Sequence, residues 1–159
     1  VPKENLLGEE GKALNTISEV IDLATLAISA EAVGIMQKMN ELTLDYTKTR
    51  EQFGQALSKF QALQHRMVDT FMVHEQTKSL LLMAAAKMND KAADTSKSIS
   101  ALKYQIGSAA KLIGEESIQL HGGMGVTEEM SIGHYFKRLT TIRTIFGNSD
   151  YHLKRYSSL

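Results

Sequence analysis

Residues 95–125 read TSKSISALKYQIGSAAKLIGEESIQLHGGMG. Apolar residues recur at helical spacing from about Thr95 to Leu120, and three glycines within four residues then interrupt the pattern. Glycine accepts a positive φ and lets another molecule approach the main chain closely. The glycine turn, Gln119–Gly125, is therefore either a tight corner or a surface that binds a ligand.

The rest of the chain carries the same helical periodicity. Apolar spacing predicts helices over about Lys12–Lys48, Lys59–Asn89 and Ile132–Ile145, and a short last helix from Ser149 or Asp150 to Tyr156. No segment alternates with period two, so no strand is predicted. Long helices with short connections predict an all-α fold, an antiparallel up-and-down four-helix bundle.

Composition excludes several classes of function. The chain has 159 residues with 18 basic and 18 acidic side chains, so it lacks the positive charge of a nucleic-acid binder. It has no cysteine, which is compatible with a reducing cytoplasm, and its five histidines show no ligand spacing, so no metal site is predicted. The longest apolar run, Leu80–Ala86, falls far short of the ~20 residues that span a bilayer.

A second corner that could bind a ligand lies between the first two long helices, at Arg50–Gly54. It combines a guanidinium that suits phosphate with an aromatic ring. The alternative is an exposed arginine beside a phenylalanine that packs the corner. In the glycine turn, Gln119 and His121 can both hydrogen-bond a polar ligand.

Five pieces in this order resemble the C-terminal helical domain of the acyl-CoA dehydrogenase family. They are NLLGEEG at 5–11, REQFG at 50–54 for the family's RxxFG, FQALQHRMVD at 60–69 for FQxxQHxxAD, QLHGG at 119–123 for Q(I/L)xGG, and GNSD at 147–150 for GTSE or GTSQ. The resemblance covers the whole chain. It implies a linker from a missing β domain at 1–11 and the helical domain at 12–159.

The resemblance implies a flavoenzyme that oxidises the α,β C–C bond of an acyl-CoA thioester with FAD as cofactor. It implies a protein that forms a homodimer or a dimer of dimers through this bundle. We expect it to be cytoplasmic and bacterial. Electron-transfer flavoprotein or a similar acceptor is the expected redox partner. No nucleic acid and no membrane insertion are expected. The chain corresponds to one third of such a subunit, so we expect it to be inactive alone.

Family positions that touch FAD carry over to particular residues here. Arg50, Gln52 and Phe53 are expected to meet the FAD pyrophosphate and adenine of the neighbouring subunit. The other expected cofactor-binding residues are Leu57 and Phe60 in the same nucleotide pocket, Gln119, His121, Gly122 and Gly123 near the adenosine portion, and Asn148 and Asp150 in the loop that replaces GTSE.

The catalytic base is where the pattern departs from the family. The usual glutamate position falls on Phe146, or on Gly147 in an alternative alignment, and the position used by some relatives falls on Ala24. None of these residues accepts a proton. Asp150 is the nearest candidate base, and Asp22 and Glu31 are weaker ones.

The base could instead come from a second protein. The pieces YFKRLT at 135–140 and FGNSDYHL at 146–153 resemble small subunits of two-component, pimeloyl-CoA-type members, so a partner subunit could carry the base. The chain would then be a non-catalytic, FAD-holding subunit. A third possibility is a scaffold domain in a relative that does not dehydrogenate.

Overall fold

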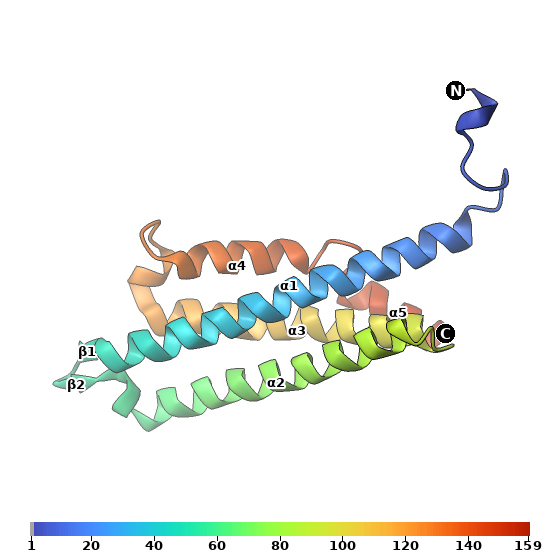
Figure 1. The fold of residues 1–159 in the computed structure, drawn as a ribbon. Helices are drawn as coiled ribbons and strands as arrows, with labels where there is room; N and C mark the ends of the chain where they lie inside the picture. The colour runs from blue at the N-terminus through green and yellow to red at the C-terminus, as the bar shows by residue number, and fades with distance from the viewer. Residues whose placement is uncertain (1) are drawn as a thin grey trace.

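A computed structural model describes residues 2–159. Its helices are η1 (Lys3–Asn5), α1 (Leu14–Thr49), η2 (Leu57–Lys59), α2 (Gln61–Asn89), α3 (Thr95–His121), η3 (Gly122–Val126), α4 (Ser131–Ile142) and α5 (Ser149–Ser158), and its two strands are β1 (Glu51–Gln52) and β2 (Gln55–Ala56). Figure 1 shows α1 to α4 running alternately up and down, with α5 lying against α3. The predicted all-α bundle is confirmed.

The central helix is α3, which contacts α1, α2, α4 and α5. Its sequence suits this place because small residues alternate with apolar ones on its buried faces. Gly114, for example, lets the Phe136 ring of α4 approach, since a Cβ at 114 would lie 3.0 Å from that ring. The fully buried large apolar residues of the core are Met36, Met39, Ile99, Leu102, Ile106, Ile113, Ile132, Leu139 and Ile142.

The prediction that the chain holds no strand was wrong by one short hairpin. Glu51 pairs with Ala56 and Gln52 with Gln55. The two residues of its loop, Phe53 and Gly54, both have positive φ, at 57° and 80°. That is the turn geometry that two-residue hairpins favour, and strands of two residues are too short to show alternation in the sequence.

The fourth helix ends earlier than predicted, at Ile142 rather than Ile145. The chain then turns through Phe146 and Gly147, whose φ angles are 58° and 103°. A left-handed pair cannot continue a right-handed helix. The other helix ends fall within two residues of the predicted ones, which is the usual uncertainty of a helix boundary.

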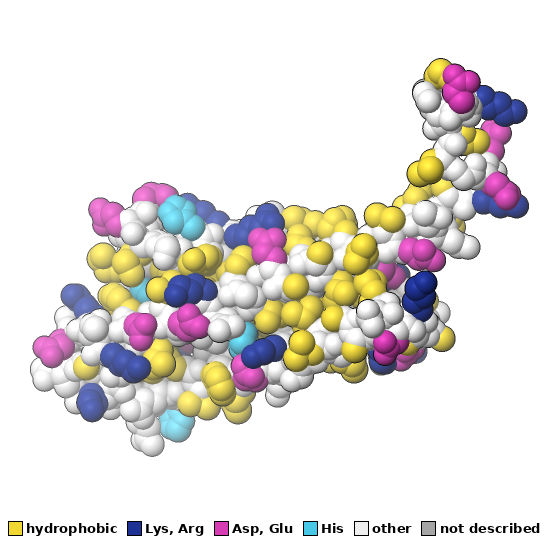
Figure 2. Space-filling view, in the orientation of Figure 1, with side chains coloured by type: hydrophobic (Ala, Val, Ile, Leu, Met, Phe, Trp, Pro, Cys, Tyr) yellow, Lys and Arg dark blue, Asp and Glu magenta, His cyan; other side chains and the backbone are white. Residues whose placement is uncertain are grey.

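The first part of the chain extends away from the bundle (Figure 1). Every residue from Pro2 to Ile21 is exposed, including the apolar side chains of Leu14, Ile17 and Val20. Figure 2 shows hydrophobic side chains gathered along α1 toward this arm. Within residues 2–159, none of the helices is long and apolar enough to cross a membrane.

Candidate functional site

The Arg50 corner and the glycine turn line one hollow at the end of the bundle where α1 and α3 finish. Its volume is 490 Å³. Its lining includes most of the predicted cofactor-binding residues: Arg50, Gln52, Leu57, Gln119, His121, Gly122 and Gly123. Two pieces of sequence that are far apart along the chain thus form a single concave surface.

The two predicted aromatic residues, Phe53 and Phe60, are not among the residues that line this hollow. Phe53 stands at the tip of the hairpin with 91% of its surface exposed. Its ring meets the edge of the Phe60 ring at a centroid distance of 6.1 Å. The corner therefore offers an exposed aromatic ring, and Phe60 packs against it.

His121 forms part of the inner wall of the hollow. Its imidazole is buried, and Nδ1 lies 2.8 Å from the carbonyl oxygen of Ser117. A carbonyl accepts only, so Nδ1 carries the proton and donates it. Burial favours the neutral ring and holds the pKa of His121 below its usual value, against the smaller opposing effect of the Ser117 bond. Nε2 is then a buried lone pair with no partner in the described part of the chain.

The glycines of the turn have different roles. Gly122 has a φ of 62°, and a Cβ built at Gly122 or Gly123 would meet no atom within 4 Å. At Gly125 a Cβ would lie 2.8 Å from the carbonyl oxygen of Ile118. The first two glycines leave the main chain open toward the hollow, whereas the third permits tight packing. The turn is therefore both a tight corner, at Gly125, and an accessible backbone surface, at Gly122 and Gly123.

Two charged residues line the hollow, and they differ in their partners. Arg66 forms an ion pair with Glu116 and is half-buried. Arg50 is exposed, and no carboxylate of residues 2–159 forms an ion pair with it. A free guanidinium beside an open glycine backbone is suited to an anionic ligand. Sequence reasoning missed Arg66 and Tyr46 as lining residues, although Arg66 lies within the matched stretch at 60–69.

Asn148 and Asp150 lie elsewhere in the same chain. The Asn148 side chain caps α5 by accepting the Tyr151 backbone N–H at 2.9 Å, and Asp150 is exposed in the first turn of that helix. Ser149 packs on Gly107 of α3, about fifteen residues before Gly122, which is about 22 Å along a helix. One chain therefore does not bring these residues to the Arg50 hollow.

The positions expected to hold the base are not acidic, and the weaker candidates are paired. Phe146 is 41% exposed and Ala24 is half-buried on α1. Asp22 is buried and accepts from both Arg155 nitrogens at 2.7 and 2.9 Å. Glu31 accepts from Arg138 at 2.6 and 2.8 Å, and this bond holds the pKa of Glu31 below its usual value. Asp150 keeps its exposed carboxylate without an ion-pair partner among the described residues.

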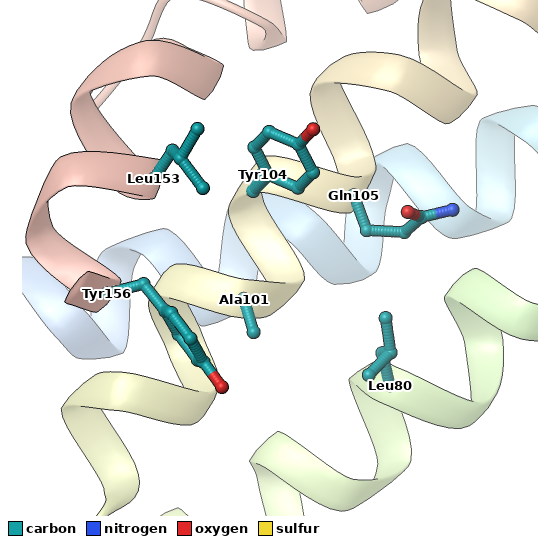
Figure 3. A pocket seen from close by; sticks show the side chains of 6 residues that line it. All are labelled: Leu80, Ala101, Tyr104, Gln105, Leu153 and Tyr156. Atoms are coloured by element: carbon teal, nitrogen blue, oxygen red, sulfur yellow. The ribbon is translucent and has the colours of Figure 1, made fainter.

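Two other hollows contain none of the predicted site residues. One, of 760 Å³, runs between α1 and α2. The other, of 310 Å³, lies between α2, α3 and α5, where Leu80, Tyr104 and Tyr156 surround it (Figure 3). No group of three or more His, Asp or Glu side chains in residues 2–159 could hold a metal ion.

The hollow, the hairpin corner and the bundle together define a domain class, and comparison with known proteins identifies it. The family described as acyl-CoA dehydrogenase, C-terminal domain, matches residues 11–157. The chain belongs to the acyl-CoA dehydrogenase family.

Individual relatives agree with this assignment. The chain is 33% identical to the mitochondrial short-chain specific acyl-CoA dehydrogenase of Rattus norvegicus over 89% of this chain and 35% of the relative. It superposes on butyryl-CoA dehydrogenase of Megasphaera elsdenii with a TM-score of 0.94 at 28% identity, over 99% of this chain and 41% of that one. The ChsE4-ChsE5 complex of Mycobacterium tuberculosis shares the fold, with a TM-score of 0.83 at 22% identity, over 87% of this chain and 37% of that one. The chain thus spans between a third and a half of the length of these relatives.

Proposed function

We propose that this chain is the C-terminal FAD-binding and dimerisation domain of an acyl-CoA dehydrogenase that oxidises the α,β C–C bond of an acyl-CoA thioester. The observation that carries the proposal is the shared hollow of Arg50 and the glycine turn. A dinucleotide needs a cation for its phosphates, hydrogen-bonding groups for its ribose and base, and backbone that it can approach closely. The lining supplies all three, so the residues present fit FAD.

Each residue has a chemical role in this proposal. Arg50 binds phosphate oxygens with its fork of N–H donors. The Gln52 and Gln119 amides donate to and accept from polar edges, and Leu57 contacts an apolar face. Gly122 and Gly123 keep the wall free of side chains. When bound, the flavin ring supplies the acceptor for the β hydride.

The site also supports the assembly that the family resemblance implies. Asn148 and Asp150 belong to the α5 end of the bundle, and the Arg50 hollow belongs to the other end. One FAD can meet both sets only if they come from two subunits. The proposed assembly is a homodimer or a dimer of dimers, with electron-transfer flavoprotein or a similar protein as electron acceptor. The chain alone is expected to be inactive.

A second candidate is a non-catalytic subunit that holds FAD while a related partner carries the base. The observation that favours it is that Phe146 and Ala24 replace a carboxylate, while Asp22 and Glu31 are held by arginines. The ChsE4-ChsE5 complex, which joins two differently named chains, is a precedent within the fold. Asp150 is the candidate base if this subunit acts alone.

The experiment that separates the two candidates uses the full-length protein loaded with FAD, a panel of acyl-CoA thioesters and an electron acceptor. Bleaching of the flavin without any other protein would exclude the non-catalytic subunit. Bleaching only after addition of a homologous partner subunit would exclude the self-sufficient enzyme. If the protein acts alone, Asp150→Asn should abolish bleaching of the flavin that stays bound, whereas Asp90→Asn, at an exposed carboxylate between α2 and α3, should change neither bleaching nor flavin content.

A further inference from the structure

The buried lysine of the core has no role in the hollow described above. Lys103 lies on α3 and is only 1% exposed. Its ammonium donates to the carbonyl oxygens of Ile142 at 2.9 Å and Gly147 at 3.0 Å, and it lies 3.5 Å from that of Arg143. No carboxylate of the described residues forms an ion pair with it. A buried cation whose partners are all backbone carbonyls is uncommon, because burial of an unpaired charge is costly.

The three carbonyls belong to the end of α4 and to the turn that follows it. Those of Ile142 and Arg143 are at the end of α4, where the last carbonyls of a helix have no partner within it. The third, of Gly147, follows the left-handed pair Phe146–Gly147. Lys103 therefore caps α4 from a neighbouring helix and ties that helix to the far side of the turn. A positive group at this end also complements the helix dipole.

The same turn is held from its other side by α5. The His152 ring is buried, and Nε2 donates to the carbonyl oxygen of Phe146 at 2.9 Å. Gly147 is needed because a Cβ there would lie 2.4 Å from the Tyr151 ring. Gly107 is needed because a Cβ there would lie 2.0 Å from Ser149 Oγ. The polypeptide from 142 to 149 is thus fixed by specific contacts along its length.

Everything that restrains this turn leaves the Phe146 side chain directed outward. The backbone carbonyl of Phe146 is held inside by His152, while 41% of the residue's surface stays exposed. A left-handed φ at a phenylalanine is rare and requires support from its surroundings. The contacts of a buried cation maintain this strained backbone, which indicates that the protein requires the Phe146 ring at this position.

We propose that Lys103 is the positioning residue of the Phe146 turn: it holds the end of α4 and the carbonyl of Gly147 together. It thereby fixes the Phe146 ring, which occupies the position where the family resemblance puts the catalytic glutamate and is therefore expected to face the acyl thioester. The part that concerns the thioester rests on the proposed function. The part that concerns the turn rests only on the contacts of Lys103 and His152.

The test uses the full-length, FAD-loaded protein with Lys103→Met, which keeps an unbranched side chain, one atom shorter, and removes its donors. The matched control is Lys111→Met, which removes an exposed lysine from the same helix. Hydrogen exchange of the amides at 144–149 should become about tenfold faster or more in Lys103→Met, because charge-assisted bonds are lost. Trypsin should cut after Arg143 sooner as well. Exchange in α1 and α2, and all values for Lys111→Met, should stay as in the wild type.

Catalysis gives the second readout. With substrate present, alone or with the partner subunit, Lys103→Met should lower kcat per bound FAD by about tenfold or more. His152→Phe keeps a ring of similar size and removes only the bond to Phe146. It should increase hydrogen exchange at 144–149 by a smaller factor than Lys103→Met does. It replaces Lys103→Met as the test variant if that protein does not fold.

The outcomes separate this inference from the proposed function. Unchanged exchange at 144–149 in the folded variants would overturn the positioning role, whatever the activity. Faster exchange with an unchanged kcat would overturn the part that concerns the thioester. If no acyl-CoA bleaches the wild-type flavin under any condition, the proposed function fails, and the exchange data still decide whether Lys103 holds the turn.

Discussion

The phenol ring of Tyr46 stacks on the imidazole of His121, with centroids 4.4 Å apart and planes 22° apart. The Tyr46 hydroxyl also donates to the His121 carbonyl oxygen at 3.3 Å. The Tyr46 carbonyl accepts the backbone N–H of Arg50 at 2.8 Å, and His121 directly precedes Gly122. This pair therefore sets the distance between the two corners that form the hollow.

The first prediction concerns this stack. Tyr46→Ala should lower the free energy of unfolding by about 3 kcal/mol, because a large half-buried ring is removed. It should also weaken FAD retention in the full-length protein, since the corners lose their fixed spacing. Tyr46→Phe keeps the stack and loses one hydrogen bond, so its cost should be about 1 kcal/mol. Urea unfolding and flavin content after dilution measure both effects, and equal losses for the two variants would contradict the role of the stack.

A second prediction concerns the cation of the hollow. Arg50→Ala in the full-length protein should weaken FAD binding by about 1.5–3 kcal/mol, because a charge-assisted bond to phosphate is lost. The helical content should persist, since Arg50 is exposed and forms no ion pair with a described residue. Lys48→Ala removes an exposed cation from the preceding turn of α1 and should retain its flavin. Equal flavin content in the two variants would count against a phosphate site at Arg50.

The glycine turn provides a third prediction, in which two substitutions act oppositely. Gly123→Val should leave stability within about 0.5 kcal/mol, because its Cβ meets no atom, and should reduce FAD retention because the side chain enters the hollow. Gly125→Val should reduce stability by about 1–3 kcal/mol, because its Cβ would press on the Ile118 carbonyl oxygen. Thermal unfolding and flavin content distinguish the two. A loss of stability at Gly123 would mean that the turn is only a corner.

The long helices were predictable because their periodicity is repeated over many turns and Pro2 is the only proline. The resemblance to the family supplied the lining of the hollow, since the spacing of apolar residues alone does not place Arg50 beside Gly122. The hairpin at 51–56 and the early end of α4 were missed because both depend on positive φ at phenylalanines. The residue type does not predict this conformation.

Charged residues of the interior were the hardest to predict. Lys103 lies in a helical stretch like any solvated lysine. Because lysines are almost never fully buried, its sequence position predicts an exposed side chain. Its partners are carbonyls some forty residues away, which carry no signal in the sequence. The sequence offers Asp22 only as a weaker candidate base, because its partner Arg155 lies 133 residues further along the chain.

A fourth prediction treats Asp22 as a structural residue. Its carboxylate is buried between Arg155 and the hydroxyl of Ser96, so it links α1 to α5 and α3. Asp22→Ala leaves a half-buried guanidinium unpaired and should cost about 3 kcal/mol of stability. The double variant Asp22→Leu with Arg155→Met should recover much of that loss, because no charge is then left alone. Urea unfolding of the wild type, the single variants and the double variant measures the coupling, and purely additive losses would contradict a specific pair.

The last prediction is a dependence of stability on pH that Lys103 should create. Burial lowers the pKa of the Lys103 ammonium from 10.5 to about 8. Between these values the unfolded chain binds the proton and the folded chain does not, so the free energy of unfolding contributed by this group rises with pH from about 8 to about 10.5. Below pH 8 both states are protonated and the contribution is constant. His152, which also holds this turn, is influenced by the charges of Lys103, Arg155 and Asp22, and burial lowers the pKa of His152 from 6.5, so its own titration lies below this window.

The measurement compares urea unfolding of the wild type with that of Lys103→Met at intervals across the window. Subtraction removes the other lysines and the tyrosines, because both proteins contain them. The free energy of unfolding of the wild type should be lower at pH 8 than at pH 10.5 by an amount on the order of 2–3 kcal/mol. This dependence on pH should be missing in Lys103→Met. Lys111→Met, which also lacks one lysine of α3, controls for the loss of a positive charge and should keep the slope. A flat difference between wild type and Lys103→Met would mean that the ammonium is solvated and does not hold the Phe146 turn from within the core.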